Sequence, residues 1–174
     1  GGYASSLDQD SNNSDNDHSA VQRGDPEMCT KMNNVIRYLI DNKNIIISIH
    51  DQGSVGLGNV VKEIVHPYGA DIHLDNVTLG DKTMDGWEIW SAEFQESNVL
   101  LIDKLSLNKL EFICKRENIS LDVLGSINNS AQIRVVFKEK ILMDLPLNEI
   151  VKPKLQKQYF LNETSYVYAK TRIK

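Results

Sequence analysis

The chain of 174 residues has only two cysteines, Cys29 and Cys114. Two cysteines cannot form a disulfide framework, so we expect a reducing compartment and predict a cytoplasmic location. No apolar run approaches the roughly 20 residues that cross a membrane, and the N-terminus lacks a basic segment followed by an apolar one, which would mark a secretory signal. The net charge of −5 argues against a general nucleic-acid binder.

The remaining composition, with 41% hydrophobic and 25% charged residues, is ordinary for a globular protein with one core. Residues 1–22 are strongly polar, and we predict that they form a flexible arm. From Lys152 the chain becomes basic, with interleaved tyrosines. That composition is also compatible with single-stranded nucleic acid, but we interpret residues 152–174 as a connector toward a domain missing from this chain. The predicted domain is therefore 23–151.

Apolar spacing divides this domain into alternating strands and helices. Asp25-Pro26-Glu27 predicts a helix start, because an acid, a proline and a second acid are favoured there. Lys138-Glu139 predicts the turn of a hairpin. The pattern indicates an α/β (α+β) fold with a mixed sheet of four or more strands packed with helices. The expected strands are 45–49, 70–74, 98–102, 119–124, 133–137 and 140–143, and the expected helices begin near Pro26, Val60, Ser106 and Pro146.

The stretch from Ile45 to Glu96 carries the residues that suggest chemistry. An isoleucine-rich strand is followed by a polar, glycine-rich turn and then by a helix. Asp51 comes where the strand ends, and backbone N–H groups collect where the helix begins, an order that suits a phosphate with its metal ion. An aspartate in a turn also commonly hydrogen-bonds its own backbone. The residues alone favour neither interpretation of Asp51.

A second acid, Glu88, lies among large side chains that include Trp87, Trp90 and Phe94. A carboxylate in such a run is unusual unless it is paired, hydrogen-bonded or bound to a cation. The residues alone leave open which of these applies to Glu88. Glu88 is also expected to share one helical face, or its C-terminal extension, with Ala92, Gln95 and Glu96.

Four blocks of this sequence resemble the large, single-chain phosphoribosylformylglycinamidine synthase family. Two of them lie within residues 48–59 and 88–96, and residues 1–6 and 20–28 match the same family in the same order. Several blocks in one order are far more specific than a single glycine motif. Beyond Leu101 the resemblance becomes a general pattern only.

The resemblance implies a fold like the C-terminal domain of the aminoimidazole ribonucleotide synthetase superfamily, taken from the first of two synthetase halves and lacking its N-terminal edge. It also implies an excised part of an ATP-dependent ligase of purine biosynthesis, unable to act alone. That enzyme converts formylglycinamide ribonucleotide and glutamine to formylglycinamidine ribonucleotide. The implied partners are the second synthetase half, the glutaminase domain and a small-molecule nucleotide, with no nucleic acid and no membrane.

The family pattern further implies Asp51 and Glu88 as ligands of Mg²⁺, and it assigns contacts with ATP or ADP to His50, Gly53, Gly56 and Gly58. No catalytic residue is implied. One position departs from the family turn, since Val55 stands where a glycine is usual. A valine disfavours positive φ and hinders close backbone approach. The competing hypothesis is a divergent or truncated module, kept for folding or interaction, that binds no nucleotide.

Overall fold

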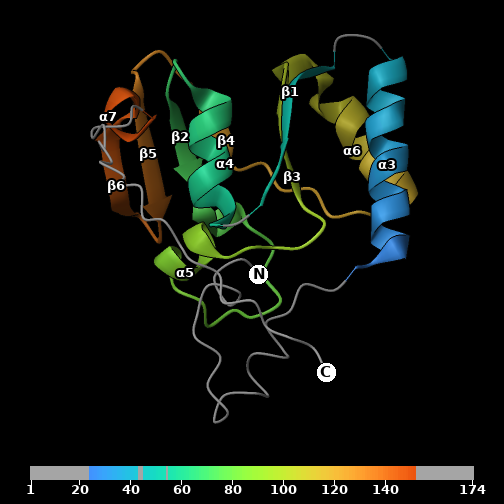
Figure 1. Ribbon diagram of the computed structural model, residues 1–174, viewed down its shortest axis with the longest axis horizontal. Helices are drawn as coiled ribbons and strands as arrows, with labels where there is room; N and C mark the ends of the chain where they lie inside the picture. The colour runs from blue at the N-terminus through green and yellow to red at the C-terminus, as the bar shows by residue number, and fades with distance from the viewer. Residues whose placement is uncertain (1–23, 43–44, 54, 152–174) are drawn as a thin grey trace, which may run out of the picture.

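The computed structural model describes residues 24–42, 45–53 and 55–151. The predicted arm 1–22 and the predicted connector 152–174 lie outside these residues, as does Ser54. The described part contains two sheets with helices on both sides of the smaller one (Figure 1). No helix in this part is long and apolar enough to cross a membrane.

The smaller sheet is an antiparallel ladder of β1 (Ile46–Asp51) and β3 (Asn98–Ile102). Its register shifts between Ile46 and Ser48, so Ile47 lies in a bulge. The helices α3 (Pro26–Asp41) and α6 (Leu107–Glu117) lie on one side of this ladder, and α4 (Gly56–Val65) lies on the other (Figure 1). The ladder is therefore enclosed between helices, and β3 contributes apolar side chains to both of its faces.

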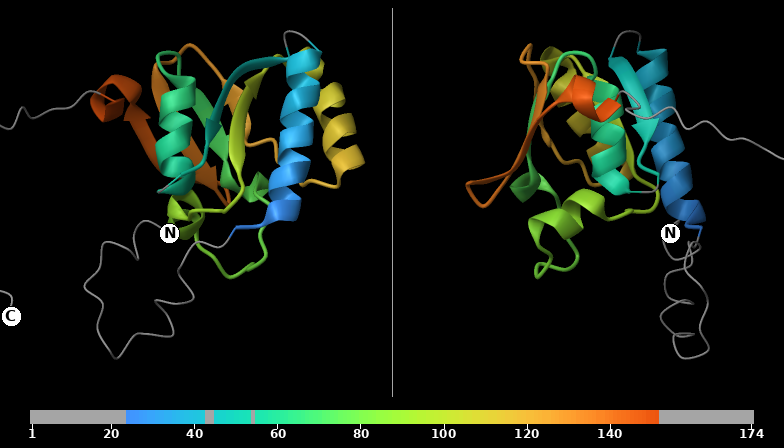
Figure 2. Two further views of the ribbon diagram at one scale, coloured as in Figure 1. Left: turned by 45° about the vertical axis from the view of Figure 1, so that its right-hand side comes forward. Right: turned by 60° about the vertical axis from the view of Figure 1, so that its left-hand side comes forward.

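The larger sheet has four strands in the order β4-β2-β5-β6, and it is mixed because only β2 and β5 run parallel. The predicted mixed sheet is confirmed, although the strand after residue 45 belongs to the separate ladder. Figure 2 shows α4 between this sheet and β1. The strands are β2 (Ala70–His73), β4 (Gly125–Ile127), β5 (Gln132–Phe137) and β6 (Lys140–Pro146), and the remaining short helices are η1 (Leu74–Asn76), α5 (Gly86–Ser91), η2 (Lys104–Ser106) and α7 (Leu147–Val151).

Two apolar clusters form the core, one on each face of the ladder. Alternate residues of β3 join different clusters, as expected for a strand buried on both faces: Val99 and Leu101 contact the first, Leu100 and Ile102 the second. The first cluster lies under α4 and the larger sheet, and the second lies under α3 and α6. Their fully buried members include Val60, Val61, Leu74, Ile89, Ile133, Val135 and Leu147 in the first, and Leu39, Ile45 and Ile113 in the second.

Local sequence signals account for several boundaries. The carboxylate of Asp25 accepts a hydrogen bond from the Met28 N–H at 3.0 Å, which caps α3 as predicted. Lys138 and Glu139 have φ values of 49° and 63°, so both central residues of the hairpin turn are left-handed. Such turns match the twist of the two strands they join, which explains why the predicted hairpin forms here.

One predicted strand is wrong. Residues 119–124 form no strand, and β4 begins only at Gly125, where the backbone of β2 approaches so closely that a Cβ atom would lie 1.9 Å from the Asp71 carbonyl oxygen. The helix that carries Glu88 ends at Ser91, because Ala92 is already extended, so Gln95 and Glu96 lie in its C-terminal extension and not on a helical face. Only glycine permits so close an approach at residue 125.

Candidate functional site

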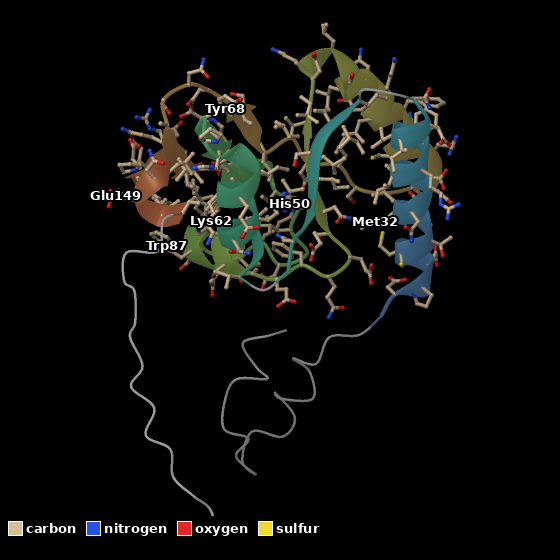
Figure 3. The ribbon with its side chains drawn as sticks, turned by 45° about the horizontal axis from the view of Figure 1, so that its top comes forward. Met32, His50, Lys62, Tyr68, Trp87 and Glu149 are labelled. Carbon is tan, nitrogen blue, oxygen red and sulfur yellow. The ribbon has the colours of Figure 1, made fainter. Side chains whose placement is uncertain are left out.

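The first candidate ligand, Asp51, ends β1 and is exposed. It lies opposite Asn98 of β3, whose amide nitrogen contacts the Met32 sulfur of α3 at 3.6 Å. Figure 3 shows Met32 on the side of α3 that faces the ladder. Within the described part of the chain, the Asp51 carboxylate has no hydrogen-bond or ion-pair partner. The carboxylate makes no hydrogen bond to the described backbone around it, so it is free to bind a cation.

The turn after Asp51 is left-handed on both sides of residue 54. The φ values of Gly53, Val55 and Gly56 are 53°, 68° and 54°. Val55 thus adopts the conformation that the sequence predicts a valine to resist, and its side chain is 60% exposed. A β-branched residue in this region is strained. The described residues on both sides of residue 54 thus have positive φ, although Val55 is not a glycine.

The N-cap residue of α4 is Val55, whose apolar side chain makes no capping hydrogen bond, so α4 starts without a side-chain cap. Gly56 donates its N–H to the Gly53 carbonyl oxygen at 3.3 Å, which closes the turn. The following N–H groups of the first helical turn have no intrahelical acceptor. Such groups, together with the helix dipole, attract an anion.

Two of the predicted glycines have a packing role that the sequence did not indicate. A Cβ atom on Gly56 would lie 1.9 Å from the carbonyl oxygen of Ala92, and one on Gly58 would lie 3.0 Å from the indole nitrogen of Trp90. The first turn of α4 therefore rests directly on the C-terminal end of α5. Contact of these glycines with a nucleotide stays a prediction.

His50 points to the face of β1 opposite Asp51, toward α4 (Figure 3). Its Nδ1 lies 3.9 Å from the Glu63 Oε2 of α4. That distance is too long for a hydrogen bond, and both side chains are more than 40% exposed, at 41% and 46%. A nucleotide contact of His50 stays a prediction.

The second candidate ligand, Glu88, already has a partner. Its Oε2 accepts the Asp85 N–H at 2.7 Å, while the Asp85 carboxylate accepts the Trp87 and Glu88 N–H groups at 2.8 and 2.9 Å. This is a capping box at the start of α5. The spacing of Asp85 and Glu88 is its sequence signature, and it would have predicted this role.

The structure brings together the elements that carry Asp51 and Glu88, but the two carboxylates point to different places. The turn after Asp51 contacts α5 at Ala92, about 6 Å along the helix axis from Glu88, and the Glu88 carboxylate is directed to the far end of α5. Across residues 24–42, 45–53 and 55–151 no group of three or more metal-binding side chains occurs. Convergence of Asp51 and Glu88 on one cation stays a prediction.

Sequence reasoning missed one residue beside the site. Gln52 is 3% exposed, and its Oε1 is buried without a hydrogen-bond partner among the residues that the structure describes. Its backbone N–H donates to the Ser97 carbonyl oxygen at 3.0 Å, which extends the ladder one residue beyond Asp51. Since side chains alternate along a strand, Gln52 lies on the α4 side. No pattern in the sequence distinguishes this buried glutamine from an exposed turn residue.

Comparison with known proteins identifies the class to which this architecture belongs. Residues 1–138 match the family described as "AIR synthase related protein, C-terminal domain". The chain belongs to this family. Its fold matches the Thermotoga maritima structure "T. maritima PurL complexed with FGAR", with a TM-score of 0.74, 20% identity, and coverage of 87% of this chain and 25% of that one. At this identity the match supports the fold alone.

The curated relatives are more specific. The chain is 47% identical over 138 residues to "Probable phosphoribosylformylglycinamidine synthase, chloroplastic/mitochondrial" of Arabidopsis thaliana, which covers 78% of this chain and 10% of the relative. It is 46% identical over 139 residues to the human phosphoribosylformylglycinamidine synthase, with coverage of 78% and 10%. The chain thus spans about a tenth of the length of the relatives it matches. These names agree with the family that the sequence blocks indicate.

Proposed function

We propose that this chain is one domain of a phosphoribosylformylglycinamidine synthase, from the first synthetase half, and that it contributes to a magnesium–nucleotide site. Its relatives carry that enzyme's name, and two structures of the same fold are described as T. maritima PurL complexed with ATP and with ADP. The observation that carries the proposal is local. Asp51, whose carboxylate has no partner among the described residues, is followed within five residues by a helix start without a side-chain cap from Val55.

The carboxylate and backbone N–H groups of the described residues fit a nucleotide with its magnesium ion. Mg²⁺ prefers hard oxygen ligands, usually one or two carboxylates together with phosphate oxygens and water. When bound, such an ion neutralises phosphate charge. Asp51 would supply one carboxylate oxygen, and the first N–H groups of α4 would hold a phosphate. The contact of Gly56 with Ala92 fixes the direction of α4, and with it the direction of those N–H groups.

Glu88 fits a second, conditional role. Its carboxylate would have to release the Asp85 N–H before it could bind a cation on the side of the turn. In the absence of such a rearrangement Glu88 stabilises α5, on which the turn rests. We therefore assign Asp51 the direct contact, and we propose Glu88 as a ligand that exchanges its capping bond for the cation.

The wider function follows from the family. The complete enzyme is proposed as an ATP-dependent ligase of purine biosynthesis that takes ammonia from glutamine, with the second synthetase half and a glutaminase domain as partners. This chain would contribute binding groups and no catalytic residue. A cytoplasmic location stays a prediction, because the name of the Arabidopsis relative gives chloroplastic/mitochondrial.

The experiment is isothermal calorimetry of the complete synthetase with ADP and MgCl₂. We expect Asp51→Asn to weaken magnesium-dependent ADP binding at least tenfold, with the melting temperature without nucleotide unchanged. Asp41→Asn, an exposed acid at the end of α3, is the control and should bind as the parent does. No magnesium-dependent heat in the parent protein would favour the competing function, a module that binds no nucleotide and serves folding or interaction.

A further inference from the structure

The buried amide of Gln52 is a polar group that the packing of the fold does not account for. Its Oε1 has no hydrogen-bond partner within the described part of the chain. Among residues 24–42, 45–53 and 55–151, Gln52 is the one polar side chain buried to this extent. An unpaired buried acceptor destabilises a fold, and the large majority of such atoms in proteins have a partner. The Oε1 of Gln52 is therefore a candidate binding group.

Gln52 faces the first turn of α4. The chain reverses after Asp51, so α4 runs back along β1, and the 3.9 Å distance between His50 and Glu63 reflects how closely the two elements lie (Figure 2). Gln52 and His50 share the α4 side of β1, since they are two residues apart on one strand. Gln52 is the nearer of the two to Gly56, where α4 begins. The unpaired oxygen and the first N–H groups of α4 are therefore neighbours.

The carboxylate of Asp51 lies at the other side of the same reversal. A Cβ atom on Gly53 would lie 3.6 Å from the Asp51 Oδ2, so this carboxylate lies over the beginning of the turn. Three kinds of binding group thus surround one turn: a carboxylate, a buried amide oxygen and helical N–H groups. The first two accept hydrogen bonds, and only the N–H groups donate them.

The chemistry of the amide oxygen restricts what it can bind. An ionised phosphate offers only acceptor oxygens, so it pairs with the N–H groups of α4 and not with the Gln52 Oε1. A water molecule bound to a cation directs its oxygen to the metal and its hydrogens outward, so it donates hydrogen bonds. Mg²⁺ usually keeps several such waters when carboxylates and phosphates hold it. A water of this kind matches the unpaired acceptor.

We propose that Gln52 is a positioning residue of the candidate site, and that its Oε1 accepts a hydrogen bond from a water molecule in the hydration shell of the bound magnesium ion. This inference rests on the proposed magnesium–nucleotide function and adds a residue that acts on the ion only through water. It explains why the oxygen is unpaired, because its partner arrives with the ligand. An amide suits this place better than a carboxylate, since a second buried charge would cost more to desolvate.

Replacing Gln52 by methionine in the complete synthetase removes the acceptor and keeps the shape of the side chain. We expect magnesium-dependent ADP binding, measured by calorimetry, to weaken about fivefold, the effect of one hydrogen bond. The melting temperature without nucleotide should stay unchanged or increase, because an apolar group then replaces an unpaired one. Gln52→Leu should behave in the same way. The control is Gln132→Met, an exposed glutamine at the start of β5, which should bind ADP as the parent does.

The hydrogen that the oxygen accepts has two sources, the hydrated ion or the nucleotide itself. We compare the ratio of dissociation constants, Gln52→Met over parent, for ADP, for a dideoxy-ADP without ribose hydroxyls and for inosine diphosphate, which lacks the exocyclic amine. The same ratio for all three supports a water on the ion. A ratio that falls to one for either analogue would identify a donor on the nucleotide and overturn the assignment to water.

A structural role for Gln52 gives the opposite pattern. If Gln52→Met binds ADP as the parent does and melts at a lower temperature without nucleotide, the partner of the oxygen lies in the protein and the proposal is overturned. Asp51→Asn separates this result from the function itself. Weakened binding in Asp51→Asn together with parental binding in Gln52→Met overturns the role of Gln52 alone, whereas a parent protein without magnesium-dependent binding overturns both.

Discussion

Replacing Gly56 by alanine tests the contact that fixes the start of α4 on α5. The added Cβ would lie 1.9 Å from the Ala92 carbonyl oxygen and 2.7 Å from its carbon, and both are backbone atoms that no rotamer change can move. The residue also has φ +54°, which costs an L-residue about 1–2 kcal/mol. Overpacking costs about 1–3 kcal/mol more.

Alanine also restricts the unfolded chain, which offsets about 0.4–1 kcal/mol of this cost. The expected net loss for Gly56→Ala is therefore about 2–4 kcal/mol in the free energy of unfolding. For a domain of this size, each kcal/mol lowers the melting temperature by about 2–4 °C. We thus expect a decrease of about 5–15 °C, measured by circular dichroism during thermal unfolding.

Gly80→Ala is the matched control, because a Cβ at Gly80 meets nothing within 4 Å and its φ is not positive. Its stability should stay within about 0.5 kcal/mol of the parent or increase slightly. Gly58→Ala should fall between the two, since its Cβ would meet a movable indole at 3.0 Å and its φ is ordinary. A Gly56→Ala variant as stable as Gly80→Ala would show that the two helices do not pack as described.

Three further predictions concern other sites. Val55→Gly should be about 0.5–1 kcal/mol more stable than Val55→Ala in denaturant unfolding, because glycine relieves the left-handed backbone strain at residue 55 that alanine retains. A higher unfolding free energy for Val55→Ala would show that residue 55 is not strained. Iodoacetamide should modify Cys29 well before Cys114 by mass spectrometry, since Cys29 is exposed and burial raises the pKa of the Cys114 thiol; equal rates would contradict that burial. The hydrogen bond from Asn34, then that from Arg116, holds the pKa of the Glu117 carboxyl below its ordinary value. This stabilisation is therefore present above the unfolded pKa of about 4.5 and is lost as the pH falls through the folded one. Asn34→Ala should accordingly lower the melting temperature more at pH 7 than at pH 3, and an equal decrease would refute the assignment.

Much of the fold could be predicted from the sequence because local signals fix individual elements. The capped start of α3 at Asp25, the hairpin turn at Lys138 and the apolar spacing of α4 all depend on neighbouring residues. Strand partners depend on distant residues and were not predictable. The strand after residue 45 pairs with β3 outside the larger sheet, and no periodicity encodes that choice.

The errors also have physical causes. Residues 119–124 have a strand-like apolar alternation, yet Ile119 and Leu121 use it to pack on the second cluster without a ladder partner. In the site, the position of Asp51 before an uncapped helix was predictable from residue order. The close approach of Gly56 to Ala92 and the burial of Gln52 were not, because both depend on where α5 lies.

The parallel pairing of β2 with β5 has a consequence for the order of folding. Ala70 pairs with Ile133, so the centre of the larger sheet joins segments separated by about half of the domain. Closing so long a loop costs entropy before any contact repays it, and folds of high contact order form slowly. During synthesis on a ribosome, β2 would emerge well ahead of its central neighbour. The helix α3 can form early, and the central sheet must wait for the last third of the domain, which contains β5 and β6.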